Sequence, residues 1–234
     1  MKIAIVSDLH ANYDALQSLP DDYDELWVLG DLVNYGPEPA EVIAFIRAKA
    51  SVAVRGNHDH SVGFGEDPRC AERFREMAAA TRRWTESILS AQDKQYLKEL
   101  PLTATVQRGT KHFYLCHALP SDPLFGYCAR DSSRWFTEVK QTTADILLVG
   151  HTHIPYARKI NRQVIVNPGS LGQPKSGSPL AQYIAWEDGK LSFCSFEYPV
   201  EETVAKIEAL PIGADVKRDL IEVLRTGSIS MTTL

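Results

Sequence analysis

The chain has 234 residues, the length of one domain or of one domain with a small appendage. Its hydrophobic fraction of 44% is enough for a large core, and its net charge of -5 gives no broad basic face for nucleic acid. No run approaches the ~18 apolar residues of a membrane helix. The N-terminal apolar run is also too short for a signal peptide. We therefore expect a single domain over residues 1–234 with no membrane partner and no strong nucleic-acid signature.

The four cysteines point to a reducing environment. They stand at positions 70, 116, 128 and 194, and no two have the CxxC spacing of a zinc or redox motif. A disulfide framework and a cysteine-rich zinc site are therefore not expected. We expect a cytoplasmic protein.

Strand-like and helix-like segments alternate over the first third of the chain. Residues 2–6 form a continuous apolar run that is typical of a buried strand, and residues 25–29 and 52–54 are similar. Helical patterns over residues 13–19 and 39–50 lie between these runs. This alternation predicts an α/β layer with parallel strands.

Polar side chains follow each of these strands at the point where the strand ends. The polar stretches are residues 7–10, 30–31 and 56–59. In open α/β sheets, ligand sites form at the carboxyl ends of the strands. The sequence therefore predicts that the fold brings these three stretches together.

Residues at about 67–100 interrupt the alternation with a helical insertion. Pro68 suits the first turn of a helix, and a helical pattern continues over residues 71–89. Ser90 and Asp93 resemble the capping pattern that opens a second helix. This helical pair could overhang the strand ends.

The second half of the chain is rich in short strand-like runs. They cover residues 103–107, 112–116, 146–149, 157–160, 163–166, 183–187 and 191–197. Turn signals at residues 161–162 and 188–189 predict hairpins, and residues 118–134 form a loop rich in turn formers. A helical C-terminal segment at about residues 200–225 follows, and residues 228–234 are expected to form a loose tail.

Five short stretches carry most of the metal-binding chemistry of the chain. They are residues 8–10, residues 30–31, residues 56–59, His117 and residues 150–153, and they contain five of the seven histidines. A divalent cation takes hard oxygen and borderline imidazole donors, and two adjacent cations need a carboxylate that bridges them. The stretches supply both kinds of donor, so the sequence predicts a dinuclear metal site.

Each stretch has a plainer interpretation when it is taken alone. Asp8 and His10 could be a capping residue and a surface histidine, and residues 30–31 form a common turn dipeptide. The stretches at 56–59 and 150–153 are stronger, because each sets amide or imidazole donors beside a glycine that allows close backbone approach. All of the stretches in this order make a highly specific signal.

The order D-x-H, G-D, G-N-H-D, a lone His and G-H-x-H resembles the signature of the calcineurin-like metallophosphoesterase superfamily. The match runs over residues 8–153 and fills every ligand position. Residues 30–37 and 167–174 are similar to the compact prokaryotic phosphoesterases of that superfamily. The resemblance implies an α/β fold, a four-layer α/β/β/α sandwich of two mixed sheets with the metals at the strand ends.

The resemblance also implies a role for each ligand. The first divalent metal would be bound by Asp8, His10 and His153, and the second by Asn57, His117 and His151. Asp31 would bridge the two ions, and a hydroxide between them would attack phosphorus in line. The mixed nitrogen and oxygen ligands suit Mn, which we favour, and also Fe, Ni, Co or Zn.

The resemblance assigns the catalytic role beside the metals to His58, which would hydrogen-bond the phosphoryl group and help to protonate the leaving oxygen. We expect Asn57 and Arg55 to bind the substrate together with His58. Lys175 also flanks a site motif and could touch phosphate.

Two positions depart from the Ser/Thr protein phosphatases of this superfamily, which read G-D-x-V-D-R-G. Asn34 stands where an Asp would pair with the catalytic His, and Tyr35 stands where an Arg would clamp a phosphate dianion. Neither side chain supplies the missing charge. We therefore expect a hydrolase of phosphodiesters or small nucleotide-like phosphate esters, with a small phosphorylated substrate as its partner.

Other functions stay open at this point. A phosphomonoesterase or protein phosphatase would use the same chemistry, and so would a diadenosine polyphosphate hydrolase, although no adenine-specific signature is present. A non-catalytic scaffold would tolerate lost ligands, and none is lost here. The sequence does not define the natural substrate, the physiological metal or the oligomeric state.

Several other polar residues have weaker claims to a role. The arginines of the helical insertion are Arg69, Arg73, Arg75, Arg82 and Arg83. Neighbouring glutamates balance them, so a solvated helix face is favoured over contact with an anionic substrate. Asp59 is expected to stabilise a turn, Cys116 to lie in the core, and His60 and His112 to be structural or exposed.

Overall fold

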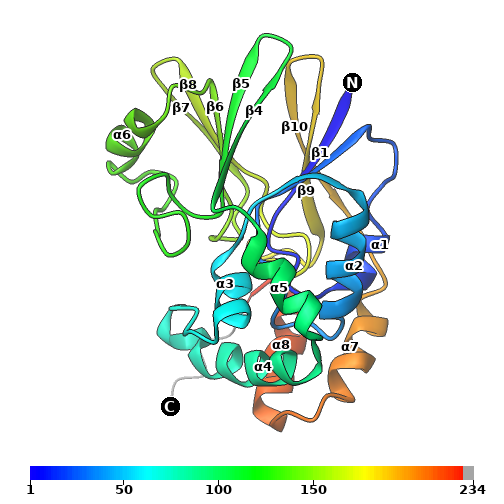
Figure 1. Cartoon of the computed structure of the whole chain (residues 1–234). Coiled ribbons are helices and arrows are strands. Elements are labelled where there is room, and N and C mark those ends of the chain that lie inside the picture. Colours follow the sequence, from blue (N-terminus) through cyan, green and yellow to red (C-terminus); the bar gives the residue numbers. More distant parts are fainter. Residues whose placement is uncertain (229–234) are drawn as a thin grey trace.

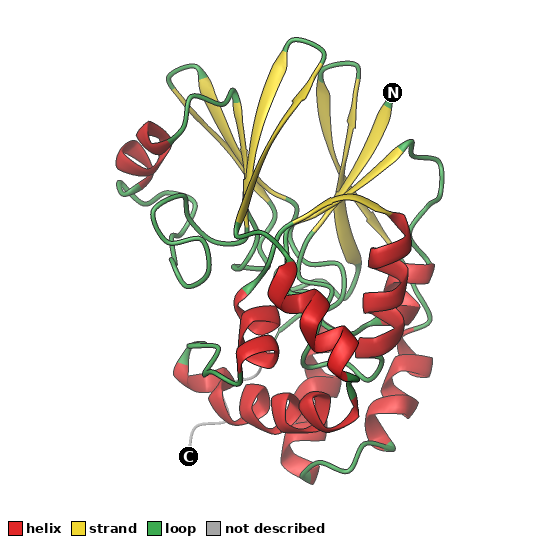
Figure 2. Cartoon of the chain, viewed as in Figure 1, coloured by secondary structure: helices red, strands yellow, loops and turns green. Residues whose placement is uncertain are grey.

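Two five-stranded mixed sheets lie face to face at the centre of the chain, as the computed structural model shows for residues 1–228 (Figure 1). The first sheet has the strand order β10-β9-β1-β2-β3, and the second has the order β4-β5-β6-β8-β7. Helices flank the two sheets on the outside, and Figure 2 shows the resulting layers. The structure confirms the predicted α/β sandwich of two mixed sheets.

Parallel pairing in the first sheet brings three strand ends to the same edge. Its strands are β1 (Lys2–Val6), β2 (Glu25–Val28), β3 (Ala50–Ala53), β9 (Ala181–Glu187) and β10 (Lys190–Phe196). β1 pairs in parallel with β2, and β2 with β3, whereas β9 pairs antiparallel with both β1 and β10. The crossover helices are α1 (Tyr13–Gln17) and α2 (Pro39–Lys49), as the alternating pattern predicts.

The second sheet follows the same plan with a parallel centre and antiparallel edges. Its strands are β4 (Thr103–Arg108), β5 (Lys111–Cys116), β6 (Ile146–Leu148), β7 (Tyr156–Ile160) and β8 (Gln163–Asn167). β5, β6 and β8 pair in parallel, and β4 and β7 pair antiparallel at the edges. The predicted hairpin turns are present, with Asn161 and Asp188 in the left-handed conformation that such turns need.

One apolar core lies between the two sheets and fixes their relative position. The Trp27 ring of the first sheet meets the Phe113 ring of the second edge-to-face, with ring centroids 5.1 Å apart. Trp186 packs on Phe113 from β9 in the same way, at 5.5 Å. Burying an apolar side chain of this size stabilises the fold by ~1.5–3 kcal/mol. The strand ends of both sheets are therefore held at one edge.

The two outer helical layers are unequal. Val42, Ile43 and Ile46 of α2 are buried against the first sheet. Within residues 1–228, the second sheet is covered by α6 (Trp135–Glu138), the short 3-10 turn η2 (Val139–Gln141) and the loop before them (Figure 1). The sequence patterns did not predict α6, because four residues are too few to show a helical period.

Helix α3 (Asn57–Phe64) is a correction to the sequence analysis, which treats residues 56–59 as a turn. The helix begins at Asn57, one of the expected metal ligands, and three residues separate it from the end of β3. The Asp59 carboxylate accepts a hydrogen bond from the Gly56 amide at 2.9 Å, which satisfies one of the free amides of the first turn. Gly65 ends the helix in the left-handed conformation.

The helical insertion and the C-terminal segment pack against each other. The insertion contains η1 (Glu72–Phe74), α4 (Arg75–Ile88) and α5 (Ala91–Glu99), and the C-terminal segment contains α7 (Val200–Glu208) and α8 (Ala214–Thr226). The predicted cap of the second helix is present, with the Asp93 amide donating to Ser90 Oγ at 3.1 Å. Met77 of α4 and Leu220 of α8 share one apolar cluster.

Two expectations concern the ends and the surface of the chain. The loose tail predicted for residues 228–234 lies outside the described residues from 229 onward. In the part of the chain that the structure describes, no helix is long and apolar enough to cross a membrane.

Candidate metal centre

The loops that follow the strands are joined by backbone hydrogen bonds. The Asp8 amide after β1 donates to the Gly30 carbonyl after β2 at 3.0 Å, and the His10 amide donates to the Asp31 carbonyl at 2.9 Å. In the second sheet, the Gly150 amide after β6 donates to the His117 carbonyl after β5 at 2.7 Å. The motif residues are therefore brought together at one edge of the sandwich, as the sequence predicts.

Most non-glycine residues with left-handed backbone are gathered in these loops. Five of the predicted ligands have φ angles between 46° and 66°: Asp8, His10, Asp31, His151 and His153. A left-handed residue with a Cβ costs roughly 1–2 kcal/mol. Strain of this kind clusters at functional sites, where the surrounding structure holds it in place.

The first group of donor atoms surrounds one oxygen of Asp8. His153 Nε2 lies 3.2 Å and His10 Nε2 lies 3.8 Å from Asp8 Oδ1. Both imidazoles and the carboxylate are buried. Asp8 Oδ1 has no hydrogen-bond donor, while Asp8 Oδ2 accepts a bond from the His151 amide at 3.1 Å. A buried carboxylate oxygen without a donor is costly unless a cation occupies the position that it faces.

The second group of donor atoms lies on the other side of Asp31. Asn57 Oδ1 is 3.0 Å from His117 Nε2, and His151 Nδ1 is 3.2 Å from both of these atoms. Asp31 Oδ2 lies 3.3 Å from His117 Nε2 and 3.7 Å from His10 Nε2 of the first group. One carboxylate oxygen thus faces both groups of donors.

Backbone carbonyls orient three of the imidazoles. The Nδ1 atoms of His10, His117 and His153 lie 3.1, 2.8 and 2.6 Å from the carbonyl oxygens of Val33, Leu29 and Gln173 respectively. A carbonyl oxygen can only accept, so each Nδ1 carries a proton, and each Nε2 points into the site as the atom that can bind a cation. This is the usual way in which a metal-binding histidine is oriented.

The electrostatics of the site favour positive charge. Burial lowers the pKa of His10 well below 6.5 and that of His151 to about 3, so both imidazoles are neutral at pH 7. For His117, burial would lower the pKa, but the Asp31 carboxylate outweighs burial and raises that pKa to about 9. His117 therefore carries a second proton on Nε2, next to Asp31, and a bound cation would replace the positive charge of that proton.

Two glycines of the motifs allow the loops to approach closely. A Cβ on Gly56 would lie 2.1 Å from Asp31 Oδ1, and a Cβ on Gly150 would lie 2.0 Å from Ser7 Oγ. Side chains cannot be accommodated at either distance. The glycines in G-N-H-D and G-H-x-H are thus required by the contact between neighbouring loops.

Asp59 has the structural role that the sequence analysis favours. Its Oδ2 accepts hydrogen bonds from the amides of Asp31 and Gly56 at 2.8 and 2.9 Å, and its Oδ1 accepts one from the Leu32 amide at 2.8 Å. The side chain is fully buried. It ties the loop after β2 to the start of α3 and so fixes the position of Asp31.

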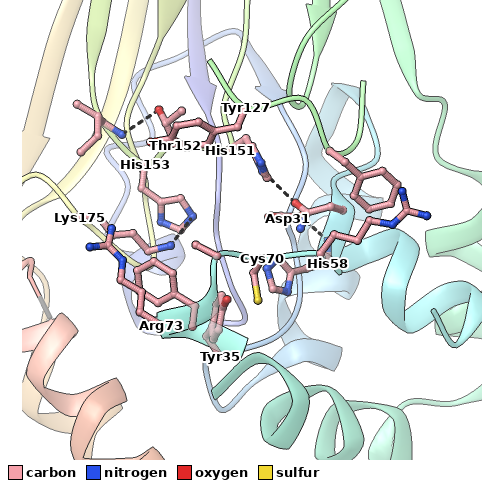
Figure 3. Close-up of a pocket in the computed structure, with 16 residues that line it drawn as sticks. Asp31, Tyr35, His58, Cys70, Arg73, Tyr127, His151, Thr152, His153 and Lys175 are labelled. Atoms are coloured by element: carbon pink, nitrogen blue, oxygen red, sulfur yellow. Dashed lines mark hydrogen bonds between the residues drawn. The ribbon is translucent and has the colours of Figure 1, made fainter. Parts of the chain in front are cut away.

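His58 faces the cavity over the donor groups without belonging to either. Figure 3 shows its ring beside Asp31, whose Oδ1 accepts a hydrogen bond from the His58 amide at 2.8 Å. Asn34 Nδ2 donates to His58 Nδ1 at 2.8 Å, which leaves the imidazole proton on Nε2. Burial lowers the pKa of His58 to about 4, so the ring is neutral at pH 7.

The sequence of the chain matches the calcineurin-like phosphoesterase superfamily domain over residues 1–187. The chain belongs to this superfamily. It is therefore a phosphoric ester hydrolase, as the resemblance of its motifs implies.

The chain is also similar to individual proteins, two of which are named as phosphoric ester hydrolases. An uncharacterized protein of Methanocaldococcus jannaschii is 29% identical over 88% of this chain and 91% of its own length. The phosphodiesterase YfcE of Escherichia coli is 27% identical over 76% of this chain and 84% of its own length. A symmetrical bis(5'-nucleosyl)-tetraphosphatase of Nitrosococcus oceani is 36% identical, over 44% of this chain and 38% of its own length.

A solved structure agrees as well. The crystal structure of a metallophosphoesterase from Sphaerobacter thermophilus superposes with a TM-score of 0.79 at 28% identity, covering 94% of this chain and 98% of that chain.

The cavity of this phosphoesterase has a volume of about 360 Å³, and His58, His151 and His153 are among the residues that line it (Figure 3). Arg55, expected to bind substrate, does not line it. Its Nη1 donates to the Lys98 carbonyl at 2.6 Å, and its guanidinium lies over the Phe64 ring. The structure therefore places the Arg55 guanidinium outside this cavity.

The arginines of the insertion are divided between two environments. Arg69 and Arg73 line the cavity, whereas Arg75 pairs with Glu72 and Arg82 with Glu86. The predicted solvated, balanced face therefore describes Arg75 and Arg82, and Arg83 is exposed outside the cavity as well.

Aromatic side chains complete the rim of the cavity. Phe74, Phe125 and Tyr127 line it, and the sequence analysis does not single them out. Apolar residues in a loop give no periodic signal, and only their position in the fold reveals them.

Proposed function

We propose that this chain is a phosphoesterase that uses two divalent metal ions to hydrolyse phosphodiesters or small nucleotide-like phosphate esters. The observation that carries the proposal is the position of Asp31 Oδ2, which faces His10 Nε2 of one donor group and His117 Nε2 of the other. The first ion would be bound by Asp8, His10 and His153, and the second by Asn57, His117 and His151. Asp31 would bind both.

The residues present fit two divalent cations. Asp8 Oδ1 is buried without a donor, and the carbonyl-bound imidazoles direct their Nε2 atoms into the site. Mixed imidazole and oxygen donors suit Mn, which we propose, and also Fe, Ni, Co or Zn. When bound, the two ions would supply an activated water as nucleophile and neutralise the charge on the phosphoryl oxygens.

His58 would act on the leaving group. Its amide is held by Asp31 Oδ1 and its Nδ1 by Asn34, so the ring is fixed in one orientation toward the cavity. With the proton on Nε2, a neutral imidazole can donate a hydrogen bond to the phosphoryl group and to the departing oxygen as negative charge develops there. Only the imidazolium form, which carries a second proton, can protonate that oxygen and leave a neutral ring. Asn34 thus orients His58 without adding the negative charge of an aspartate.

The choice of a diester or a nucleotide-like ester rests on Tyr35. The Tyr35 ring lies 4.8 Å from the His58 ring and 4.7 Å from the His10 ring, at the place where a clamping arginine would stand in the protein phosphatases. A phosphomonoester dianion gains most from such a clamp, and a diester carries one charge fewer. The names of the Escherichia coli and Nitrosococcus oceani relatives support the same choice.

All four cysteines are free thiols, which supports a reducing compartment, the cytoplasm, as the place of action.

The test is a comparison of substrates after reconstitution with each metal. We expect kcat/KM for bis-nitrophenyl phosphate to exceed that for a phosphoserine peptide, with Mn²⁺ among the most effective ions. Elemental analysis should give two ions per chain at saturation. A clear preference for the phosphopeptide would contradict the proposed substrate class, and a single ion at saturation would contradict the dinuclear site.

A further inference from the structure

Two positive side chains share one aromatic ring at the edge of the cavity. Lys175 Nζ lies 4.2 Å and the Arg73 guanidinium carbon 4.7 Å from the centroid of the Phe74 ring. Figure 3 shows Arg73 and Lys175 together on the His153 side of the cavity. Like charges so close repel each other. An arrangement of this kind is stabilised when an anion lies against both charges.

The structure provides no protein anion for this pair. Among the ion pairs within residues 1–228, none joins Arg73 or Lys175 to a carboxylate within 4.0 Å. Arg75, two positions further along the same segment, pairs with Glu72. Arg73 and Lys175 thus both line the cavity without a carboxylate partner.

Metal binding would increase the excess of positive charge. Lys175 Nζ now lies 3.3 Å from His153 Nε2, the nitrogen that would bind the first ion. A lone pair that binds a metal cannot also accept from an ammonium, so Lys175 would lose this partner. The ions would also neutralise Asp8 and Asp31, the acidic groups whose field reaches Lys175. The pair would then need a negative charge from the substrate.

We propose that Arg73 and Lys175 form a subsite for a second phosphoryl group of the substrate, next to the group that is hydrolysed. The proposal rests on the proposed function, and it names nucleoside polyphosphates and other phosphoanhydride-bearing esters as the substrate class. A guanidinium offers two parallel donors and an ammonium a point charge, a combination that suits phosphoryl oxygens.

The geometry separates this subsite from the group undergoing hydrolysis. The scissile phosphoryl group must lie near Asp31 and within reach of His58. Figure 3 shows Lys175 and His58 on opposite sides of Tyr35, whose ring centroid is 5.7 Å from Lys175 Nζ. The two cations therefore lie beyond Tyr35, where a neighbouring phosphoryl group would reach them.

The test compares two nucleotides that differ by one phosphoryl group, AMP and a methylene-bridged ADP that cannot be hydrolysed at the bridge. Their binding to the metal-loaded protein is measured by calorimetry with free Mn²⁺ in constant excess, and the recovered AMP is checked by chromatography. We expect the ADP analogue to bind more tightly. Arg73→Gln and Lys175→Met should each weaken binding of the ADP analogue by about 10- to 100-fold, the range for a charge-assisted hydrogen bond. The dissociation constant of AMP should change by less than about threefold.

Arg75→Gln is the matched control, since Arg75 is also exposed, lies in the same segment and does not line the cavity. If binding of AMP and of the ADP analogue were weakened equally, Arg73 and Lys175 would contact the phosphoryl group that is hydrolysed, and the proposed subsite would be wrong. It would also be wrong if binding of the analogue were unchanged, or if Arg75→Gln weakened that binding as much. If the protein bound no metal and did not hydrolyse bis-nitrophenyl phosphate, the proposed function itself would be wrong. That result is separate from the nucleotide comparison.

Discussion

The loops at the strand ends and the helical insertion face the same cavity, yet they are built differently. The loops hold their donor atoms in buried positions, at fixed motif spacings and with backbone hydrogen bonds between neighbouring loops. The insertion brings exposed residues such as Arg73 to the rim from the 3-10 turn η1, whose Phe74 shares an apolar cluster with the C-terminal helices. The difference indicates that the donor atoms are held rigidly, whereas the proposed contacts to a second phosphoryl group come from a separate element at the surface.

The physical basis of this division is the cost of movement. Displacing Asp31 would break the bonds that its amide and its carboxylate make with Asp59 and His58 inside the core. Arg73 can change its conformation without exposing any buried polar group. Substitutions in the loops should therefore have far larger effects than substitutions in or around the insertion.

The largest effect is expected for Asp31→Asn. An amide cannot supply the negative charge that both ions need, so metal content should fall and kcat should drop by more than about 10³-fold, because a catalytic ion contributes several kcal/mol. Elemental analysis and an assay with bis-nitrophenyl phosphate measure both. The exposed Asp21→Asn is the control. A fully active Asp31→Asn protein with two ions would show that the loops are not organised around this carboxylate.

His58→Ala should cost about 10²- to 10⁴-fold in kcat, the range for general acid catalysis, while both metals stay bound. The loss should be smaller for substrates with good leaving groups such as nitrophenolate, because these need less protonation. His60→Ala is the matched control, since His60 lies on the same helix and contacts Glu66 instead of the site. If His58→Ala loses a metal, His58 is a ligand and its assigned role is incorrect.

Gly56→Ala tests whether the loops are packed as tightly as the structure indicates. The new Cβ would lie 2.1 Å from Asp31 Oδ1 and would force the two loops apart. We expect the free energy of unfolding to fall by about 1–3 kcal/mol, the usual cost of overpacking. Urea denaturation measures this, with Gly213→Ala as the control, because a Cβ there meets no atom within 4 Å. Equal stability of the two variants would mean that the loop contact is loose.

Arg55→Gln should have the smallest effect of the four. Its guanidinium bonds the Lys98 carbonyl and does not line the cavity, so kcat/KM should change by less than about threefold. The loss of one hydrogen bond should lower the free energy of unfolding by about 0.5–1.5 kcal/mol. Steady-state kinetics and urea denaturation check the two values. A large rise in KM with unchanged stability would bring Arg55 back into the substrate site.

The sequence predicted the regular elements well where an apolar period was long or a turn signal was strong. The three parallel strands of the first sheet, the hairpins at 161–162 and 188–189, and the cap formed by Ser90 and Asp93 are examples. Helix α3 was missed because its first residues are polar and lack a helical apolar stripe, and its start is fixed by the Asp59 carboxylate in three dimensions.

The sequence by itself indicated the family, and through that resemblance the sandwich fold and the candidate donor residues, because the order and spacing of the motifs can be read along the chain. Only the tertiary structure decided where the remaining charged residues lie. Arg55 stands one residue from the G-N-H-D motif and faces away from the cavity, whereas Arg73 and Lys175 are 102 residues apart and share the Phe74 ring. Side-chain direction depends on how the elements pack, and packing couples residues that no local pattern connects.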